Sequence, residues 1–315
     1  MQILLTRKLH KFAIKELEKH YKISIHDGKI PIPKKKLMEK IKNIDGLICF
    51  PYDSIDREII EKAKNLKVIS TYSVGYDHID LVAAKKKNIR IGYTPDVLTG
   101  ATADLTIGLI LDLMRRITEG DRLIRRGSWH KIFGPSDYVG VDLEGKTLGI
   151  FGIGRIGKAV AKRARGFGMN IQYNSRKRLS KNQEKVLGIK FVSFYKLVRS
   201  SDILSIHAPY KPETHHLINF KTMKKMKKTA MLINTARGKI VNEEDLVKAL
   251  KRKIISGAGL DVFEREPIKK SHELTKMENV VLAPHIGSSS AETRKKMASI
   301  AVQNLVLGLE KKKMV

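Results

Sequence analysis

Short apolar runs alternate with amphipathic stretches along the whole chain. The apolar runs have the length of strands, whereas the stretches between them repeat apolar residues about every three to four positions, as helices do. This alternation is typical of parallel α/β sheets, in which a helix follows each strand. We expect strands at Gln2–Thr6, Leu47–Phe50, Val68–Thr71, Arg90–Gly92, Thr147–Phe151, Ile171–Tyr173, Asp202–Ile206, Ala230–Ile233, Gly257–Asp261 and Val280–Leu282.

Two long helices interrupt or close this series. One, with an apolar stripe, is expected from Gly100 to Arg116, and the other from about Ser290 to Leu309. Between the two groups of strands, the segment from Gly127 to Gly145 is rich in glycine, proline and tyrosine. A chain of 315 residues with such a break is long enough for two domains, each with its own core.

Composition excludes some classes of protein. The formal charge is +30, but the lysines are spread along the chain without a nucleic-acid-binding motif, so we interpret them as solvated faces that attract anionic ligands and expect no nucleic acid partner. No apolar run approaches the roughly 20 residues of a membrane span, and we expect no membrane partner. The single cysteine, Cys49, lies in an apolar run, which favours a reducing cytoplasm. No Cys/His spacing indicates a metal site.

The sharpest local motif is the glycine triplet Gly152, Gly154 and Gly157. It leaves an apolar strand and opens an apolar-periodic helix, which is the context that dinucleotide binding requires. The first glycine makes the tight turn, the second lets the backbone approach a pyrophosphate, and the third allows close packing of helix and strand. The amino end of the helix then faces the phosphate charge. The motif therefore predicts a dinucleotide cofactor.

The next strand is followed by Ser175, Arg176, Lys177 and Arg178. Sites for NAD usually carry an Asp or Glu there, which accepts hydrogen bonds from the ribose 2′-hydroxyl. A hydroxyl and guanidinium groups would instead bind a 2′-phosphate. We therefore expect NADP(H) as the preferred cofactor, with NAD(H) as the alternative because arginine is common throughout the chain.

Polar residues follow three later strands, at the edge where open α/β sheets bind ligands. Arg237 follows the first of these strands, Asp261, Glu264 and Glu266 follow the second, and His285 follows the third. Hydride transfer to a 2-oxo carbon leaves negative charge on oxygen, so a proton donor and a fixed cation are needed. His285 suits the donor, Glu266 would orient it and favour its charged form, and Arg237 can bind a carboxylate and polarise the carbonyl.

Several blocks, in order, resemble the D-isomer-specific 2-hydroxyacid dehydrogenase family, and within it the glyoxylate/hydroxypyruvate reductases. The blocks are Tyr72–Asp80, Gly152–Gly157, His207–Pro209, Asn234–Gly238, Gly259–Glu264 and Pro284–Gly287. One departure concerns the segment His130–Gly140, which does not match the tryptophan-containing stretch of hydroxypyruvate-preferring members. The resemblance covers nearly the whole chain and implies NAD(P)-dependent reduction of a small 2-oxo acid to the D-2-hydroxy acid.

The resemblance also implies further site residues. Val74 and Gly75 would offer backbone N–H groups to the substrate carboxylate, together with Arg237 and His285. Asp261 would accept a hydrogen bond from the nicotinamide carboxamide. The expected cofactor contacts are Thr102, Gly152, Ile153, Gly154, Arg155, Ile156, Gly157, Ser175, Arg176, Lys177, Arg178, His207, Ala208, Pro209, Thr214, Thr235, Ala236, Arg237, Asp261, His285 and Gly287.

The family's architecture is discontinuous. It implies two Rossmann-like or flavodoxin-like α/β domains with parallel sheets, the cofactor domain (100–286) being inserted into a substrate domain (1–99 plus 287–315). It also implies a homodimer formed through the cofactor domain. Two alternatives stay open: a dinucleotide-sensing protein like the corepressors built on this fold, or another dehydrogenase of the family, acting on phosphoglycerate or on bulkier 2-oxo acids.

Overall fold

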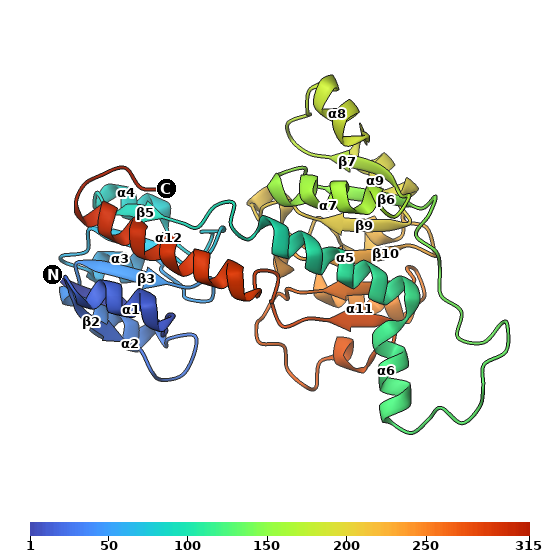
Figure 1. Ribbon diagram of the computed structural model, residues 1–315, viewed down its shortest axis with the longest axis horizontal. Coiled ribbons are helices and arrows are strands. Elements are labelled where there is room, and N and C mark those ends of the chain that lie inside the picture. The colour runs from blue at the N-terminus through green and yellow to red at the C-terminus, as the bar shows by residue number, and fades with distance from the viewer. The chain divides into compact units, whose positions relative to one another are not determined.

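The computed structural model describes residues 1–315 and divides into two compact units. Unit 1 comprises residues 1–98 and 288–315, and unit 2 comprises residues 99–287, each limit one residue away from the expected domain limit. Both units are built on sheets of parallel strands flanked by helices (Figure 1). This confirms the expected fold class.

Unit 1 contains a five-stranded parallel sheet in the order β2-β1-β3-β4-β5, the flavodoxin-like order. Helix α12 and helix α1 cover one face, and α2, α3 and α4 cover the other. The strands are β1 (Gln2–Leu5), β2 (Lys22–Ile25), β3 (Gly46–Cys49), β4 (Val68–Thr71) and β5 (Arg90–Gly92). The helices are α1 (Lys11–Glu18), α2 (Lys34–Lys40), the 3-10 turn η1 (Ile41–Asn43), α3 (Arg57–Lys62), α4 (Leu81–Lys86) and α12 (Ala291–Leu309).

Unit 2 contains a seven-stranded parallel sheet in the order β12-β11-β10-β9-β6-β7-β8. Counted within the unit, this is the dinucleotide-binding order 3-2-1-4-5-6 with one strand added, and the order reverses at β6. The strands are β6 (Thr147–Phe151), β7 (Asn170–Asn174), β8 (Ile189–Phe191), β9 (Ile203–Ile206), β10 (Met231–Asn234), β11 (Gly257–Leu260) and β12 (Val280–Leu282).

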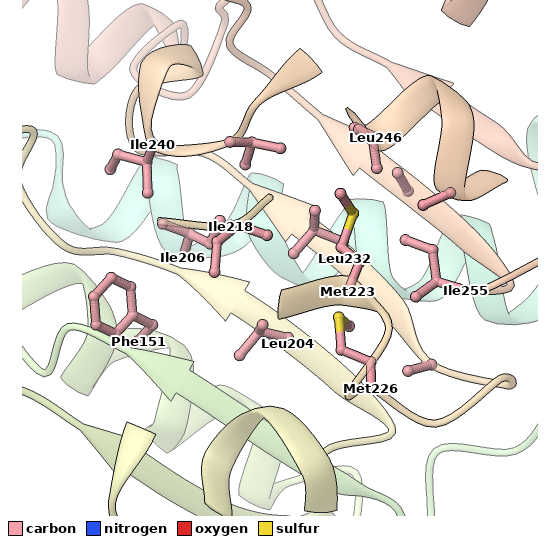
Figure 2. Close-up of a cluster of buried hydrophobic side chains, with 14 of the residues drawn as sticks. Phe151, Leu204, Ile206, Ile218, Met223, Met226, Leu232, Ile240, Leu246 and Ile255 are labelled. Atoms are coloured by element: carbon pink, nitrogen blue, oxygen red, sulfur yellow. The ribbon is translucent and has the colours of Figure 1, made fainter. Parts of the chain in front are cut away.

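The helices of unit 2 lie on both faces of this sheet. Helices α5 and α7 cover one face, and α9, α10 and α11 enclose a second apolar cluster on the other, part of which is drawn in Figure 2. The helices are α5 (Thr99–Arg115), α6 (Ile117–Arg125), α7 (Arg155–Arg165), α8 (Lys181–Leu187), α9 (Phe194–Ser200), α10 (Phe220–Met223) and α11 (Glu243–Lys251). The 3-10 turns are η2 (Pro212–Thr214), η3 (Gly238–Ile240) and η4 (Glu273–Lys276).

All ten expected strands are present, four with the expected ends and six with ends that differ by one residue, and two further strands were missed. Both missed strands, β2 and β8, lie at the end of a sheet. Each has polar or half-exposed positions, because an edge strand is only partly covered. Their apolar signal is therefore weak.

The long helix after unit 1 also differs from the expectation. It ends at Arg115, because Arg116 adopts a left-handed conformation with φ 55°, and α6 begins at Ile117. The side chain of Asp112 accepts hydrogen bonds from the N–H (2.7 Å) and the hydroxyl (2.5 Å) of Thr118. These bonds tie the first turn of α6 to α5. None of the helices has the length and apolar character needed to cross a membrane.

Candidate active site

The glycine motif forms the turn between β6 and α7, and each glycine is used differently. Gly152 has φ 101°, and a Cβ there would lie 2.4 Å from the backbone nitrogen of Ala208. A Cβ on Gly157 would lie 2.3 Å from the carbonyl oxygen of Gly152, so helix and strand are packed as closely as glycine allows. A Cβ on Gly154 would meet nothing within 4 Å. This open space before the helix suits a phosphate group.

A cavity of about 1010 Å³ extends from this turn over the carboxyl ends of the central strands. Most of the expected cofactor contacts on this side line it. Its lining comprises Phe151, Gly152, Ile153, Gly154, Ser175, Arg176, Lys177, Arg178, Leu179, Ser180, Gln183, His207, Ala208, Pro209, Lys211, Glu213, Thr214 and Leu217. Arg155 and Ile156 form the first turn of α7, where backbone N–H groups point out of the helix end. The cavity is large enough for a nucleotide, and the residues present fit a dinucleotide.

Of the four residues after β7 (Ser175–Arg178), two use their side chains in hydrogen bonds within the protein, and two have charged side chains exposed at the cavity. The Arg178 guanidinium donates to both oxygens of Glu184, at 2.8 and 2.9 Å, and lowers the pKa of that carboxyl to about 2. The Ser175 hydroxyl donates to the Lys177 carbonyl at 2.6 Å. Arg176 and Lys177 are exposed at the cavity. Arg178 is thus neutralised within the protein, and of the basic residues after β7 only Arg176 and Lys177 offer their charge to a cofactor.

His207 lies at the end of β9, beside the glycine turn. Burial lowers the pKa of His207 to about 3, so its ring is neutral at physiological pH. Its Nε2 lies 2.8 Å from the Ser205 hydroxyl. Thr214 closes the loop beyond by donating to the Pro209 carbonyl at 3.1 Å. His207, Ala208 and Pro209 thus present an uncharged surface, suited to an adenosine, and the charged residues Lys211 and Glu213 follow on the same loop.

The three candidate catalytic residues all lie in unit 2, each just after a neighbouring strand of the sheet. Arg237 follows β10, and its backbone is fixed by Asn234, whose amide accepts from the Ala236 N–H (3.1 Å) and donates to the Arg237 carbonyl (2.9 Å). The guanidinium donates to the Ala236 carbonyl at 2.8 Å. Asn234 is almost fully buried, so its hydrogen bonds to this turn are shielded from water.

Glu266 and His285 form a close pair. The Nδ1 atom of His285 lies 2.6 Å from Oε2 of Glu266, and the two side chains are 25% and 17% exposed. The other oxygen of Glu266 accepts a hydrogen bond from the Phe263 N–H at 2.9 Å. The structure therefore brings these two predicted residues together, with the carboxylate oriented by its own loop.

Asp261 has a structural role that the sequence did not reveal. Its two oxygens accept the N–H groups of Ile286 (2.7 Å) and Gly287 (2.8 Å), directly after His285, which has φ 54°. Burial raises the pKa of Asp261 to about 6, against the lowering effect of these two N–H groups. Asp261 thus holds the strained turn that presents His285. Its predicted bond to a nicotinamide carboxamide stays a prediction.

The remaining predicted residues lie in two places. In unit 2, Thr102 donates to the Gly287 carbonyl at 3.1 Å, near the turn of His285. The hydroxyl of Thr235 lies 3.0 Å from that of the buried Thr106, and Thr235 and Ala236 directly precede Arg237. In unit 1, Val74 and Gly75 follow β4, where the Ser73 hydroxyl donates to the Gly75 carbonyl at 2.6 Å. Both residues are half-buried, and their role in binding the substrate stays a prediction.

Comparison with known proteins agrees with this geometry. Residues 107–287 match the family model described as D-isomer specific 2-hydroxyacid dehydrogenase, NAD binding domain. The chain belongs to this family, and it is an NAD(P)-dependent oxidoreductase that acts on CH-OH groups.

Individual relatives within this family are similar to the chain over nearly its whole length. The chain is 46% identical over 310 residues to a glyoxylate reductase of Thermofilum pendens, covering 98% of this chain and 91% of that one. A crystal structure of a Thermus thermophilus protein, 44% identical, superposes with a TM-score of 0.92 over 99% of this chain and 98% of the other. An NADPH-dependent glyoxylate/hydroxypyruvate reductase of Sinorhizobium meliloti, in complex with NADP and malonate, is 30% identical with a TM-score of 0.84, covering 97% and 92%.

Proposed function

We propose that the protein reduces glyoxylate, hydroxypyruvate or a similarly small 2-oxo acid to the D-2-hydroxy acid, with Arg237, Glu266 and His285 as its catalytic residues. The observation that carries the proposal is the 2.6 Å contact between His285 Nδ1 and Glu266 Oε2, in the unit that holds the glycine turn. The names of the relatives support the substrate class.

The protein's own groups manage the proton and the charge. When bound, the nicotinamide supplies the hydride. His285 donates through Nδ1 to Glu266, so the proton passed to the substrate oxygen leaves from Nε2. Glu266 stabilises the charged imidazole before transfer and keeps the ring oriented as it becomes neutral. In the reverse direction, neutral His285 accepts the hydroxyl proton.

Arg237 handles the substrate's negative charge. A guanidinium binds a carboxylate with two parallel hydrogen bonds, which orients the adjacent carbonyl. It also stabilises the charge that develops on the carbonyl oxygen. Because Asn234 fixes the backbone of this turn, we expect little reorganisation of that backbone when substrate binds.

A steady-state panel tests the proposed function directly. The purified protein is assayed with NADH and NADPH, each against glyoxylate, hydroxypyruvate, pyruvate, 2-oxoisocaproate and phenylpyruvate. We expect the highest kcat/KM with glyoxylate or hydroxypyruvate. A preference for phenylpyruvate or 2-oxoisocaproate would contradict the substrate class, and no turnover of any of the five would contradict the function.

For the cofactor, NADP(H) is proposed as the preferred form, with NAD(H) as the alternative. Arg176 and Lys177 are exposed at the cavity, next to the Ser175 hydroxyl, and none of the four residues after β7 is an Asp or Glu that would repel a 2′-phosphate. The Sinorhizobium relative, described as NADPH-dependent, supports this choice.

Replacing Arg176 by alanine should raise the KM for NADPH by roughly 10-fold or more, the usual cost of a lost hydrogen bond to a charged group. The KM for NADH should change less than about 2-fold, because NADH has no 2′-phosphate. Arg199→Ala, an exposed arginine on α9 outside the cavity, serves as the matched control. Equal losses for the two cofactors would show that Arg176 does not read the phosphate.

The proposed partner is a second copy of the same chain. Helix α6 buries none of its residues, and apolar side chains on it and on the following segment are exposed: Ile117 58%, Ile124 60%, Trp129 55%, Ile132 91% and Val139 60%. Surfaces of this kind in a folded protein usually mark a protein interface. The segment is itself ordered by stacking of Phe133 on Tyr138, with ring centroids 5.2 Å apart.

Sedimentation should show a dimer for the wild-type protein, and Ile124→Asp should shift it to the monomer because a carboxylate would be buried without a partner. Val186→Asp, at a 70% exposed position on α8, is the control and should leave the mass unchanged. A monomeric wild-type protein, or a dimer that survives Ile124→Asp, contradicts this interface.

A further inference from the structure

The loop that carries Glu266 is anchored to a helix that supplies no catalytic residue. This loop, residues 262–266, follows β11, and helix α11 begins with Glu243. The Glu264 N–H donates to Glu243 Oε2 at 3.1 Å, and the Glu243 N–H donates to Glu264 Oε1 at 2.8 Å. Each residue thus binds the backbone of the other, and we call this reciprocal pair the glutamate clasp.

Two carboxylates so close together need compensation, and two histidines lie against them. His272 Nε2 lies 3.0 Å from Glu243 Oε1, and His216 Nε2 lies 3.1 Å from Glu264 Oε1. Because His272 Nδ1 accepts the Leu274 N–H, the ring proton of its neutral form is on Nε2, facing Glu243. Burial raises the pKa of Glu243, and the Glu264 N–H and His272 oppose this effect. The clasp is therefore a built polar cluster within unit 2.

The clasped loop touches both other parts of the catalytic machinery. Within the loop, the Phe263 N–H fixes Glu266 Oε1, while Glu266 Oε2 contacts His285. On its other side, a Cβ on Gly238 would lie 1.9 Å from the Phe263 carbonyl carbon, so the loop backbone packs directly on the residue after Arg237. A shift of this loop would consequently displace Glu266 and disturb the turn of Arg237.

We propose that Glu264, together with Glu243, is a positioning residue of the reaction: the clasp holds the 262–266 loop so that Glu266 meets His285. The inference rests on the proposed function, because it assumes that the Glu266–His285 pair works in catalysis. Neither glutamate of the clasp is assigned contact with substrate or cofactor. The essential feature is the hydrogen bond from the Glu243 N–H to the Glu264 side chain rather than the charge of that side chain.

The test compares Glu264→Ala with Glu264→Gln. The alanine variant loses the acceptor, and we expect kcat to fall about 10- to 100-fold, since misplacing a catalytic group by about 1 Å has a cost of this order. The glutamine variant keeps an oxygen that can accept the Glu243 N–H, and its kcat should stay within about 3-fold of wild type. The KM for NADPH should change less than about 2-fold in both variants. A general loss of structure would raise it, so this readout separates misplacement of the loop from unfolding.

Two controls separate the possible failures. Glu278→Ala removes an exposed carboxylate at the amino end of β12, away from the loop, and should leave kcat unchanged. Glu266→Gln tests the catalytic role on which this inference rests: if its kcat is normal, the role proposed for Glu266 is wrong. If Glu266→Gln is slow but Glu264→Ala has wild-type kcat, or if alanine and glutamine at 264 lose equally, the clasp proposal is overturned. Should Glu264→Ala not fold, Glu243→Ala takes its place with the same expectations, because it removes the other acceptor of the clasp.

Discussion

Replacing His285 by alanine should lower kcat for glyoxylate or hydroxypyruvate by about 10²–10⁴-fold, the usual contribution of a positioned acid–base group. The imidazole is held by Glu266 through Nδ1 and by the turn that Asp261 fixes, so its Nε2 has a defined direction. Neither of the other two proposed catalytic residues can donate a proton in this way: Glu266 is bound to the histidine, and the guanidinium of Arg237 keeps its protons. The measurement is steady-state kinetics with saturating NADPH.

The same variant should bind NADPH nearly as well as the wild type, because the glycine turn and the basic residues after β7 lie on other strands. A fluorescence titration of NADPH checks this. His285→Gln, which can form a hydrogen bond but does not titrate, should be as slow as His285→Ala. His20→Ala, an exposed histidine after α1, is the control for removal of an imidazole. Turnover within about 2-fold of wild type in His285→Ala would remove this residue from the mechanism.

Much of unit 2 could be predicted because its signals are local. The strand–Gly152–helix pattern specifies a turn whose backbone, at φ 101°, only glycine adopts readily. The polar residues after β10, β11 and β12 could be placed at one edge because parallel strands end there together. The sequence could therefore place Arg237, Glu266 and His285 at one edge of the sheet, where the structure brings Glu266 and His285 into contact.

What could not be predicted depends on contacts between distant residues. Glu243 opens an ordinary helix with Asn242 as its cap, and nothing in its neighbourhood marks it as a partner of Glu264, 21 residues later. Arg178 looked equivalent to Arg176 in sequence, and only the position of Glu184 on α8 shows that one of them is already paired. The break at Arg116 is not marked by a glycine or proline, and the Asp112–Thr118 contact beside it joins residues six apart in the chain.

Replacing Arg237 by alanine should lower kcat/KM for 2-oxo acids by about 10²–10³-fold, the cost of losing a positioned donor to a developing oxyanion. Both parameters should change, because the guanidinium is proposed to bind the substrate carboxylate in the ground state and to stabilise additional charge in the transition state. NADPH binding should be nearly unaffected, since the glycine turn that is proposed to hold the phosphates lies at β6. Parallel assays with glyoxylate and hydroxypyruvate measure the effect.

Arg237→Lys separates charge from geometry. Lysine restores the positive charge but not the planar fork that binds a carboxylate through two parallel bonds, so it should recover only part of the loss. The backbone of the turn should persist in both variants, because Asn234 holds it through the carbonyl of residue 237 and the N–H of residue 236. A normal kcat/KM in Arg237→Ala would exclude the role in substrate binding and charge stabilisation that is proposed for this residue. Full recovery by lysine would show that a point charge suffices, and that other groups orient the carbonyl.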